Sequence, residues 1–256
     1  MGKIISIANQ KGGVGKTTTS VNLSSCLALA GKKVLLIDAD PQGNATSGCG
    51  GTKNVEKSTY DLIIHQEKLS NVVQPTAVEN LEVCAANIDL AGAEVELVSQ
   101  ISRETKLKEV LEKEKGNYDY IIIDCPPSLG LVTLNSLTAS DSVLVPIQCE
   151  YYALEGLGQL MSTIDLVQKH LNPKLDIEGV VLTMYDARTN LSRQVIDEVK
   201  KYFKNKVYKT IIPRNVKLSE APSYGLPISL YDKKSEGSKA YTALANELIR
   251  QNKIRN

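Results

Sequence analysis

The segment from Lys11 to Thr18, KGGVGKTT, contains the groups that bind a chain of phosphates. Its glycines let successive backbone N–H groups turn toward phosphate oxygens, where a side chain would obstruct them. Lys16 can neutralise the outer phosphates, and the Thr17 hydroxyl is a ligand for Mg²⁺. The pattern predicts that a nucleotide contacts every residue of the segment, namely Lys11, Gly12, Gly13, Val14, Gly15, Lys16, Thr17 and Thr18.

The loop departs from the commonest phosphate-loop pattern, G-x-x-x-x-G-K-[ST], at its start. That pattern places glycine at position 10, where this chain has Gln10, and here a second lysine, Lys11, follows. A lysine at the mouth of the loop points past its own nucleotide and can neutralise phosphates held by a facing subunit. This interpretation predicts a homodimer that depends on nucleotide. The alternative is a generic loop with a solvated lysine.

Carboxylates follow two other apolar runs. Asp38 and Asp40 come directly after Leu35-Leu36-Ile37, and Asp124 ends the run that begins at Tyr120. A carboxylate at the end of a buried strand is costly to desolvate unless a cation lies close. Mg²⁺ and the loop lysines would supply that charge, with Asp124 holding the metal through a water shared with Thr17. For Asp38 the alternative is a cap in a strand-to-loop turn.

The loop lies between a predicted strand and a predicted helix, the context that a phosphate loop requires. The same alternation continues along the chain and predicts a doubly wound, mostly parallel α/β sheet in one domain, residues 1–256. The predicted strands are Ile4–Ala8, Lys33–Asp38, Leu81–Ala85, Tyr120–Asp124, Ser142–Ile147, Ile177–Thr183 and Val207–Ile212. The predicted helices are Thr18–Ala30, Ala93–Lys115, Gly130–Ala139, Glu155–His170, Ser192–Phe203 and Ser238–Asn252.

The segment from Gly50 to Glu79 is the least regular, and we expect short helices and loops there. In the last predicted helix, Tyr241, Leu244, Ala245, Leu248 and Ile249 share one face. Ligands in sheets of this kind bind at the carboxyl ends of the strands. The three groups of charged residues therefore belong to one site.

Composition is that of an ordinary globular chain, with 42% hydrophobic and 23% charged residues among 256. No apolar run is long enough to cross a membrane, and no signal peptide is evident. The five cysteines show no metal-binding spacing, so we expect buried free thiols in the reducing cytoplasm.

Charge is distributed unevenly along the chain. Residues 198–256 contain 13 Lys and Arg against 5 Asp and Glu, whereas residues 1–197 contain 17 against 24. This asymmetry predicts a surface for a polyanion near the C-terminal end. The alternative is a set of lysines that only solvate helix faces.

The loop with its extra lysine resembles the deviant Walker A signature, xKGGxGK[ST], of the family that includes the ParA/Soj partition ATPases, MinD and the nitrogenase iron protein. The string DADPQGN from Asp38 to Asn44 resembles that family's second element. The strings Asp186–Asn190 and Pro213–Ser223 look specifically like chromosomal ParA (Soj) proteins. The resemblance extends from Gln10 to about Tyr231.

This resemblance implies ATP and Mg²⁺ as cofactors and a role for each matching residue. Asp40 would orient or activate the attacking water, beside the catalytic lysines Lys11 and Lys16. Thr17, Asp38 and Asp124 would hold the metal. The adenine ring would lie near Met184, Pro213, Arg214 and Asn215, and Glu150 would approach the nucleotide or the dimer partner.

In the Soj group, arginines in the two late strings bind DNA. Arg188 occupies the first place, and Lys217 occupies the second, where the group often has arginine. Lysine still neutralises a phosphate but loses bidentate geometry. The DNA-binding candidates are Arg188, Lys200, Lys201, Lys204 and Lys217, with Lys233 and Lys234 as further ones.

The expected function is an ATP-driven partitioning switch in the nucleoid. The ATP-bound dimer would bind double-stranded DNA without reading its sequence, and hydrolysis, stimulated by a ParB/Spo0J-type centromere-binding protein, would release it. The first alternative is a MinD-type membrane-cycling ATPase, which needs a C-terminal amphipathic helix that leaves the fold. The others are an iron–sulfur reductase, for which Cys125 alone is too little, and a metabolic P-loop synthetase.

Overall fold

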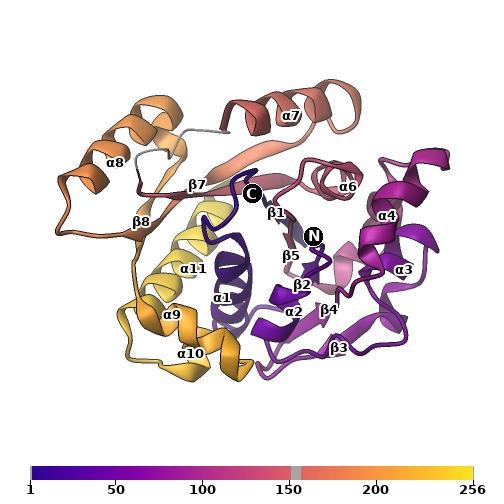
Figure 1. The fold of residues 1–256 in the computed structure, drawn as a ribbon, viewed down its shortest axis with the longest axis horizontal. Coiled ribbons are helices and arrows are strands. Elements are labelled where there is room, and N and C mark those ends of the chain that lie inside the picture. The colour runs from indigo at the N-terminus through magenta and orange to yellow at the C-terminus, as the bar shows by residue number, and fades with distance from the viewer. Residues whose placement is uncertain (1, 151–156, 256) are drawn as a thin grey trace.

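A computed structural model describes residues 2–150 and 157–255. Its centre is an eight-stranded sheet in the order β3-β4-β2-β5-β1-β6-β7-β8, with helices on both faces (Figure 1). Only β3 runs antiparallel to its neighbour among the described strands. The predicted fold class, a doubly wound and mostly parallel α/β sheet, is confirmed.

The strands are β1 Lys3–Ile7, β2 Val34–Asp38, β3 Val73–Pro75, β4 Leu81–Cys84, β5 Tyr120–Asp124, β6 Ser142–Gln148, β7 Asp176–Tyr185 and β8 Val207–Pro213. The helices are α1 Lys16–Leu29, α2 Asn44–Gly48, α3 Thr59–Ile64, α4 Leu90–Glu96, α5 Lys106–Glu114, α6 Leu131–Ala139, α7 Leu157–His170, α8 Asn190–Phe203, α9 Val216–Glu220, α10 Ile228–Tyr231 and α11 Glu236–Arg255. Short 3-10 turns are η1 Leu69–Asn71, η2 Leu97–Ser99, η3 Lys115–Asn117, η4 Lys204–Lys206 and η5 Ala221–Tyr224.

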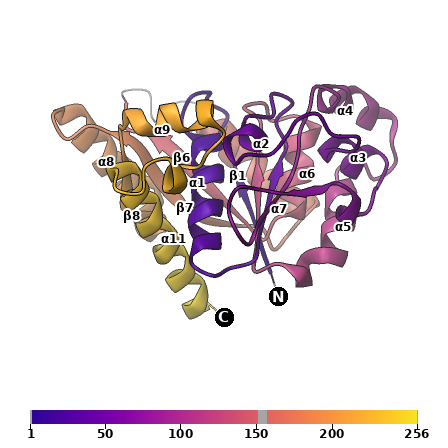
Figure 2. The same cartoon turned by 90° about the horizontal axis from the view of Figure 1, so that it is seen from below.

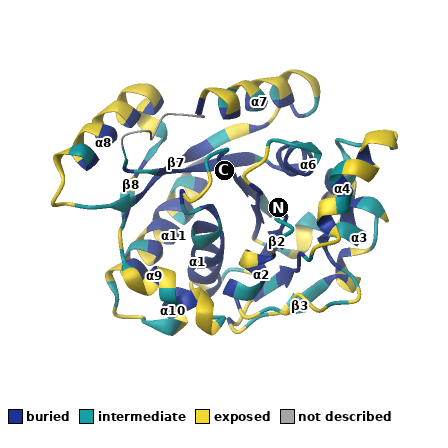
Figure 3. Cartoon of the chain, viewed as in Figure 1, coloured by how far each residue is buried: buried dark blue, intermediate teal, exposed yellow. Residues whose placement is uncertain are grey.

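Two apolar layers enclose the sheet, because its central strands are apolar on both sides. One layer packs α3 to α8 against the sheet, and the other packs α1, α2, α10 and α11 against it. Figure 3 shows that the sheet and α1 are largely buried, with exposed residues on the outer faces of α7 and α8. Strands buried on both faces are typical of parallel sheets, so their near-continuous apolar runs could be recognised in the sequence.

Strand β1 lies between β5 and β6, where the order of the strands reverses. The chain builds β2, β4 and β5 on one side of β1 and then β6, β7 and β8 on the other. Figure 2 shows α2, α4 and α9 along one edge of the molecule and both termini at the opposite edge. The loop after β1 therefore opens at the carboxyl edge of the sheet, at the switch point where such folds bind ligands.

The prediction of one helix over Ala93–Lys115 is wrong. The structure has α4, η2, a break at residues 100–105 and then α5. Ser102 has φ 53°, and the Thr105 hydroxyl donates a hydrogen bond to the Ser102 carbonyl, 3.0 Å away. Asn135 of α6 fixes the break, because its amide donates to the Arg103 carbonyl at 2.7 Å. Hydrogen bonds from side-chain hydroxyl groups to the nearby backbone compete there with the helical backbone bonds. The contact with Asn135, distant in the sequence, favours the break over a continuous helix.

The region from Gly50 to Glu79 contains α3 and η1, as expected, and also the unpredicted strand β3. Strand β3 has only three residues and ends in Pro75, which the edge of a sheet tolerates. The predicted helix Glu155–His170 corresponds to α7. Its predicted start at Glu155 lies outside the described residues, which resume at Leu157. The other predicted boundaries agree with the structure to within three residues, and Tyr120–Asp124 matches at both ends.

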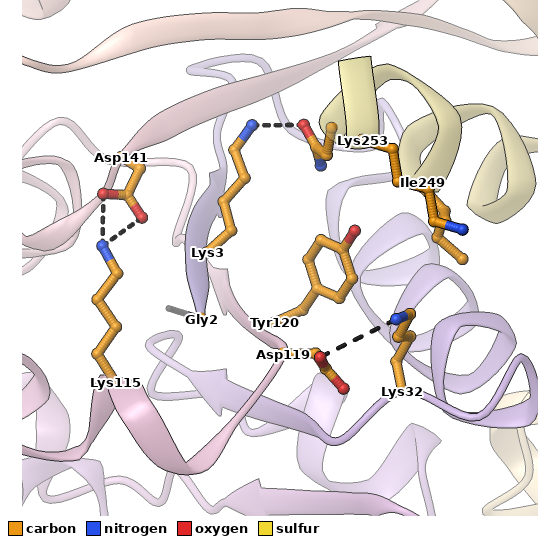
Figure 4. A pocket seen from close by; sticks show the side chains of 10 residues that line it. Gly2, Lys3, Lys32, Lys115, Asp119, Tyr120, Asp141, Ile249 and Lys253 are labelled. Atoms are coloured by element: carbon orange, nitrogen blue, oxygen red, sulfur yellow. Dashed lines mark hydrogen bonds and ion pairs between the residues drawn. The ribbon is translucent and has the colours of Figure 1, made fainter. Parts of the chain in front are cut away.

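Helix α11 lies against α1 and β8, and its apolar face is part of the core. Tyr241, Leu244, Ala245 and Leu248 are fully buried, and Ile249 is partly buried beside them. Near its end, Asn252 accepts a hydrogen bond of 2.7 Å from Lys3 of β1. Figure 4 shows Lys3 extending toward α11 across a cavity of about 440 Å³ at the amino edge of the sheet. Among the described residues, no helix is long and apolar enough to cross a membrane.

Candidate active site

The loop between β1 and α1 is fixed from both flanks by side chains that our sequence analysis did not single out. Buried Asn9 donates to the Pro146 carbonyl of β6 at 2.7 Å and accepts from the Lys11 N–H at 3.0 Å. Thr183 of β7 donates to the Val14 carbonyl at 2.8 Å. Neither residue belongs to a local motif. Only their position at the carboxyl edge, Asn9 just after β1 and Thr183 near the end of β7, could have indicated them.

Two loop glycines adopt left-handed conformations, with φ 74° at Gly13 and φ 87° at Gly15. A side chain would be strained at either position. At Gly12 and Gly13 a Cβ would meet no atom within 4 Å, so both face open space. This space lies at the N-terminus of α1, where unpaired N–H groups favour an anion.

The two lysines of the loop have different surroundings. Lys16 is buried, and its ammonium group donates to the Lys11 carbonyl at 3.0 Å. Burial lowers the pKa of Lys16, against the attraction of Asp124. The side chain of Lys11 is half-buried at the mouth of the loop. Thus Lys16 belongs to the interior of the site, and Lys11 lies at its rim.

Asp38 and Asp124 are direct neighbours at the ends of β2 and β5, and both are fully buried. Burial, and secondarily the nearby Asp38, raises the pKa of Asp124 to about 7. Ser20 donates to its Oδ1 at 2.7 Å, while Oδ2 is buried with no hydrogen-bond partner in the described part of the chain. Thr17 is close enough to lower this pKa slightly. A buried carboxylate oxygen without a donor, next to a threonine hydroxyl, fits a divalent cation.

The Asp38 carboxylate holds the loop that carries Asp40. Its Oδ2 accepts from the Thr46 N–H and hydroxyl, both at 2.7 Å, and its Oδ1 accepts from the Asp40 N–H at 3.2 Å. Burial raises the pKa of Asp38 to about 6 despite these bonds. Asp40 is half-buried and accepts from the Gln42 N–H at 2.9 Å. The geometry combines the two interpretations of Asp38, because it both caps a turn and lies beside Asp124.

The structure brings the four predicted adenine contacts together. Met184, Pro213, Arg214 and Asn215 line one cavity of about 430 Å³ with Gly15 and Thr18 of the phosphate loop. Met184 has φ 52°, a conformation unusual for a residue with a side chain. Arg214 also forms an ion pair of 2.9 Å with Glu150 across the mouth of this region. Hence Glu150 reaches a predicted nucleotide contact.

The basic residues of the DNA-binding set do not form one cluster. Arg188 and Lys217 follow β7 and β8, at the same edge as the phosphate loop. Lys200, Lys201 and Lys204 are exposed at the opposite end of α8, a helix about 20 Å long. Each residue at the carboxyl edge has an acidic partner. Asp186 holds the guanidinium of Arg188 with two bonds of 2.9 and 2.7 Å, and Glu220 lies 2.9 Å from Lys217.

All five cysteines are buried and free, as expected. Burial raises the pKa of Cys125 to about 12. In the described residues no group of His, Cys, Asp and Glu is arranged to hold a metal by itself. Buried, protonated thiols do not fit a cluster shared at a dimer axis.

Comparisons with known proteins identify the family of this chain. Residues 2–177 match the family model described as an AAA domain. The chain is 67% identical over 249 residues to the sporulation initiation inhibitor protein Soj of Bacillus subtilis, covering 97% of this chain and 98% of that one. It is 55% identical to the chromosome partitioning protein ParA of Myxococcus xanthus, covering 98% and 89%.

The chain belongs to the ParA/Soj family of chromosome-partitioning ATPases. Among solved structures, cobyrinic acid a,c-diamide synthase of Mycobacterium smegmatis with bound ATP analogue and magnesium has a TM-score of 0.88 at 39% identity, covering 100% of this chain and 98% of that one. The same protein was also solved with ADP and magnesium. These relatives of the ParA/Soj ATPases confirm the expectation of ATP and Mg²⁺ as cofactors. The identity to the partitioning proteins exceeds that to the synthase.

Proposed function

We propose that this ATPase is a nucleotide-operated DNA switch that closes into a homodimer when it holds ATP and Mg²⁺. The observation that carries the proposal is the arrangement of two lysines and two buried carboxylates at the switch point of the sheet. One lysine, Lys16, is inside the site, and the other, Lys11, is at its rim. A rim lysine can neutralise phosphates on a facing subunit, which links the dimer to the nucleotide.

Within one subunit, the chain's own groups would position the reacting atoms. Backbone N–H groups from Gly12 to Thr18 cradle the phosphates, and Lys16 leaves the Lys11 carbonyl to bind an outer phosphate oxygen. Thr17 and Asp124 would hold Mg²⁺, which would supply positive charge to the phosphates. Asp40, held by Asp38 and the turn that follows, accepts a hydrogen bond from the attacking water. Phosphoryl transfer depends mainly on such positioning, so a partner that improves the positioning would accelerate an otherwise slow turnover.

The same edge of the sheet would present Arg188 and Lys217 to the DNA backbone. In the free chain, Arg188 and Lys217 form ion pairs with Asp186 and Glu220. DNA phosphates would therefore compete with these carboxylates for the two basic side chains. Lys200, Lys201 and Lys204, at the opposite end of α8, would form a second and separate basic contact. Contacts of this kind neutralise phosphates and carry no sequence information. A dimer doubles this surface, which explains why DNA binding would follow the nucleotide state.

Hydrolysis would return the dimer to weakly binding monomers, accelerated by a ParB/Spo0J-type centromere-binding protein, and the chain would reside in the nucleoid. The buried apolar face of α11 supports this function over membrane cycling, because that face contributes to the core.

The test is binding to non-specific duplex DNA with ATP, ADP or no nucleotide, over a salt series. Asp40→Ala is used beside the wild type to suppress turnover. We expect binding only with ATP, with log affinity falling by about 0.9 per phosphate neutralised for each log unit of salt. Absence of DNA binding in every state would overturn the proposal. Attachment to anionic liposomes with ATP would assign the chain to the membrane-cycling class instead.

A further inference from the structure

The segment from Ile88 to Ile101, which includes α4 and η2, has apolar side chains on two opposite sides. On the inner side, Leu90, Ala93 and Leu97 are fully buried. On the outer side, a row of large apolar side chains is exposed to solvent. We call these four residues the α4 ridge: Ile88, Val95, Val98 and Ile101, with exposed fractions of 71%, 75%, 59% and 88%. Figure 3 shows this exposed outer part of α4.

The ridge has the spacing of a contact surface. Ile88, Val95 and Val98 are seven and three residues apart, which places them on one side of a helix. Scattered exposed residues need no explanation, whereas large apolar side chains gathered on one side of a helix indicate an interaction site. The ridge therefore lacks a covering element in the isolated chain.

Charges around the ridge indicate the chemistry of what covers it. From Ile88 to Ile101 the chain contains three carboxylates and no basic residue, and Arg103 just beyond pairs with Glu104 at 2.9 Å. Asp89 and Glu96 flank the ridge itself. A second copy packed ridge to ridge would bring like charges together, which costs free energy. A basic helix with an apolar face complements both the charge and the apolar row.

Helix α4 also contacts the segment that follows Asp124. The Glu94 carboxylate accepts hydrogen bonds from the N–H groups of Leu131 and Val132, at 2.7 and 3.2 Å, and so caps the first turn of α6. Only residues 125–130 separate this turn from Asp124. A partner that displaces α4 can therefore shift the first turn of α6 and, with it, the segment that follows the Asp124 carboxylate.

We propose that the α4 ridge is the docking site for a basic amphipathic helix of the partner protein that accelerates hydrolysis, acting on the Asp124 segment through Glu94. This inference rests on the proposed function, because it assigns a place and a chemistry to the accelerating partner. The occupant binds by its apolar face, and its basic residues pair with Asp89 and Glu96.

The test uses the full chain and the purified ParB-type protein encoded in the same genome, measuring binding and ATPase rate separately. Val95→Ser/Val98→Ser removes apolar surface from exposed positions, and Leu166→Ser is the control, since Leu166 is 57% exposed on α7. We expect the double variant to need at least about tenfold more partner for half-maximal stimulation, with unchanged basal turnover. Leu166→Ser should behave as wild type. Glu96→Gln should weaken partner binding less than the double variant.

Three results would overturn the ridge as the docking site. If the wild type is stimulated and the double variant needs no more partner, the ridge is wrong and the proposed function stands. If the double variant instead loses ATP-dependent dimers in sedimentation, the ridge contacts a second copy. If the wild type neither binds nor responds to the partner, both the accelerated cycle and the ridge proposal fail.

The coupling through Glu94 has its own measurement. At saturating partner, Glu94→Ala should bind it normally but show a ratio of stimulated to basal turnover reduced several-fold. Glu94→Gln, which keeps one acceptor for α6, should recover part of that ratio. A ratio equal to that of the wild type in both variants would overturn the coupling.

Discussion

Lys11 and Lys16 show how two residues of one type acquire different tasks within six positions. Lys16 is enclosed, and burial depresses its pKa, so it provides a desolvated charge for phosphate oxygens. Lys11 is half-buried at the rim, where a facing molecule can reach it. In the proposed function, Lys16 would bind a nucleotide within one chain, whereas Lys11 would act between two chains. Substitutions at these positions should therefore separate nucleotide binding from dimerisation.

Lys11→Ala should leave nucleotide binding by the monomer intact while abolishing ATP-dependent dimers. Lys16→Ala, the matched control, should lose nucleotide binding itself. Fluorescent-nucleotide titration and sedimentation velocity measure the two properties. ATP-dependent dimers of Lys11→Ala would remove the cross-subunit role of this lysine.

Arg188→Ala should lose most DNA binding while ATP-dependent dimers persist. Arg188 is the most exposed of the ion-paired basic side chains described, and it lies outside the nucleotide cavity. Lys217→Arg should strengthen DNA binding several-fold, because a guanidinium group binds phosphate with two parallel bonds. DNA-binding curves at fixed salt test both variants. Unchanged binding by Arg188→Ala would exclude it from the interface.

Helix α11 shows how an element completes the edge of the sheet. Strand β8 is an edge strand, and buried Glu247 of α11 accepts from the N–H groups of Lys209 and Thr210, at 2.8 and 3.0 Å. The same carboxylate accepts from the Thr210 hydroxyl at 2.7 Å. An edge strand otherwise presents unpaired N–H groups to other chains. Glu247 thus caps this edge and holds the strand that carries Pro213, which lines the cavity beside the phosphate loop.

Glu247→Ala should reduce the free energy of unfolding by about 3 kcal/mol, since a carboxylate with three donors is lost from a buried position. Glu236→Ala, at the exposed start of the same helix, should change it by less than about 0.5 kcal/mol. Urea denaturation measures both. A Glu247 variant as stable as the Glu236 control would show that the edge needs no cap.

At the scale of the whole molecule, the pairing of β2 with β5 forces two carboxylates together. The sheet buries Asp38 and Asp124 side by side, and burial raises both pKa values above the ordinary value of 3.8. The folded, nucleotide-free chain therefore binds more protons than the unfolded chain between about pH 4 and pH 7. The free energy of unfolding therefore falls as pH rises through this window. Above pH 7 the full cost of ionising the two buried carboxylates is present.

Asp124→Asn should raise the stability of the nucleotide-free chain at pH 8 by on the order of 2 kcal/mol. The variant should also lose most of the decrease in stability between pH 4 and pH 7. Thermal unfolding across this range measures the slope. An equal slope in wild type and variant would show that Asp124 is ionised at neutral pH without cost.

Local patterns were sufficient to predict most of the fold. Apolar runs identified seven of the eight strands in the described chain, because strands buried on both faces are apolar throughout. The short edge strand β3 lacks such a run, and Pro75 disguises it further. The break between α4 and α5 was missed because a side chain of α6, Asn135, decides it.

The sequence by itself determined the phosphate loop, the order of strands and helices, and which strands end in carboxylates, since spacing along the chain fixes each of these. Only the tertiary structure decided what surrounds them. It placed Asn9 and Thr183 on the loop, set Asp38 beside Asp124, closed the cavity at Met184, and separated Arg188 from Lys200 by the length of a helix. Contacts between distant segments depend on how the strands are ordered side by side in the sheet and on their register. Local sequence patterns do not encode either of these.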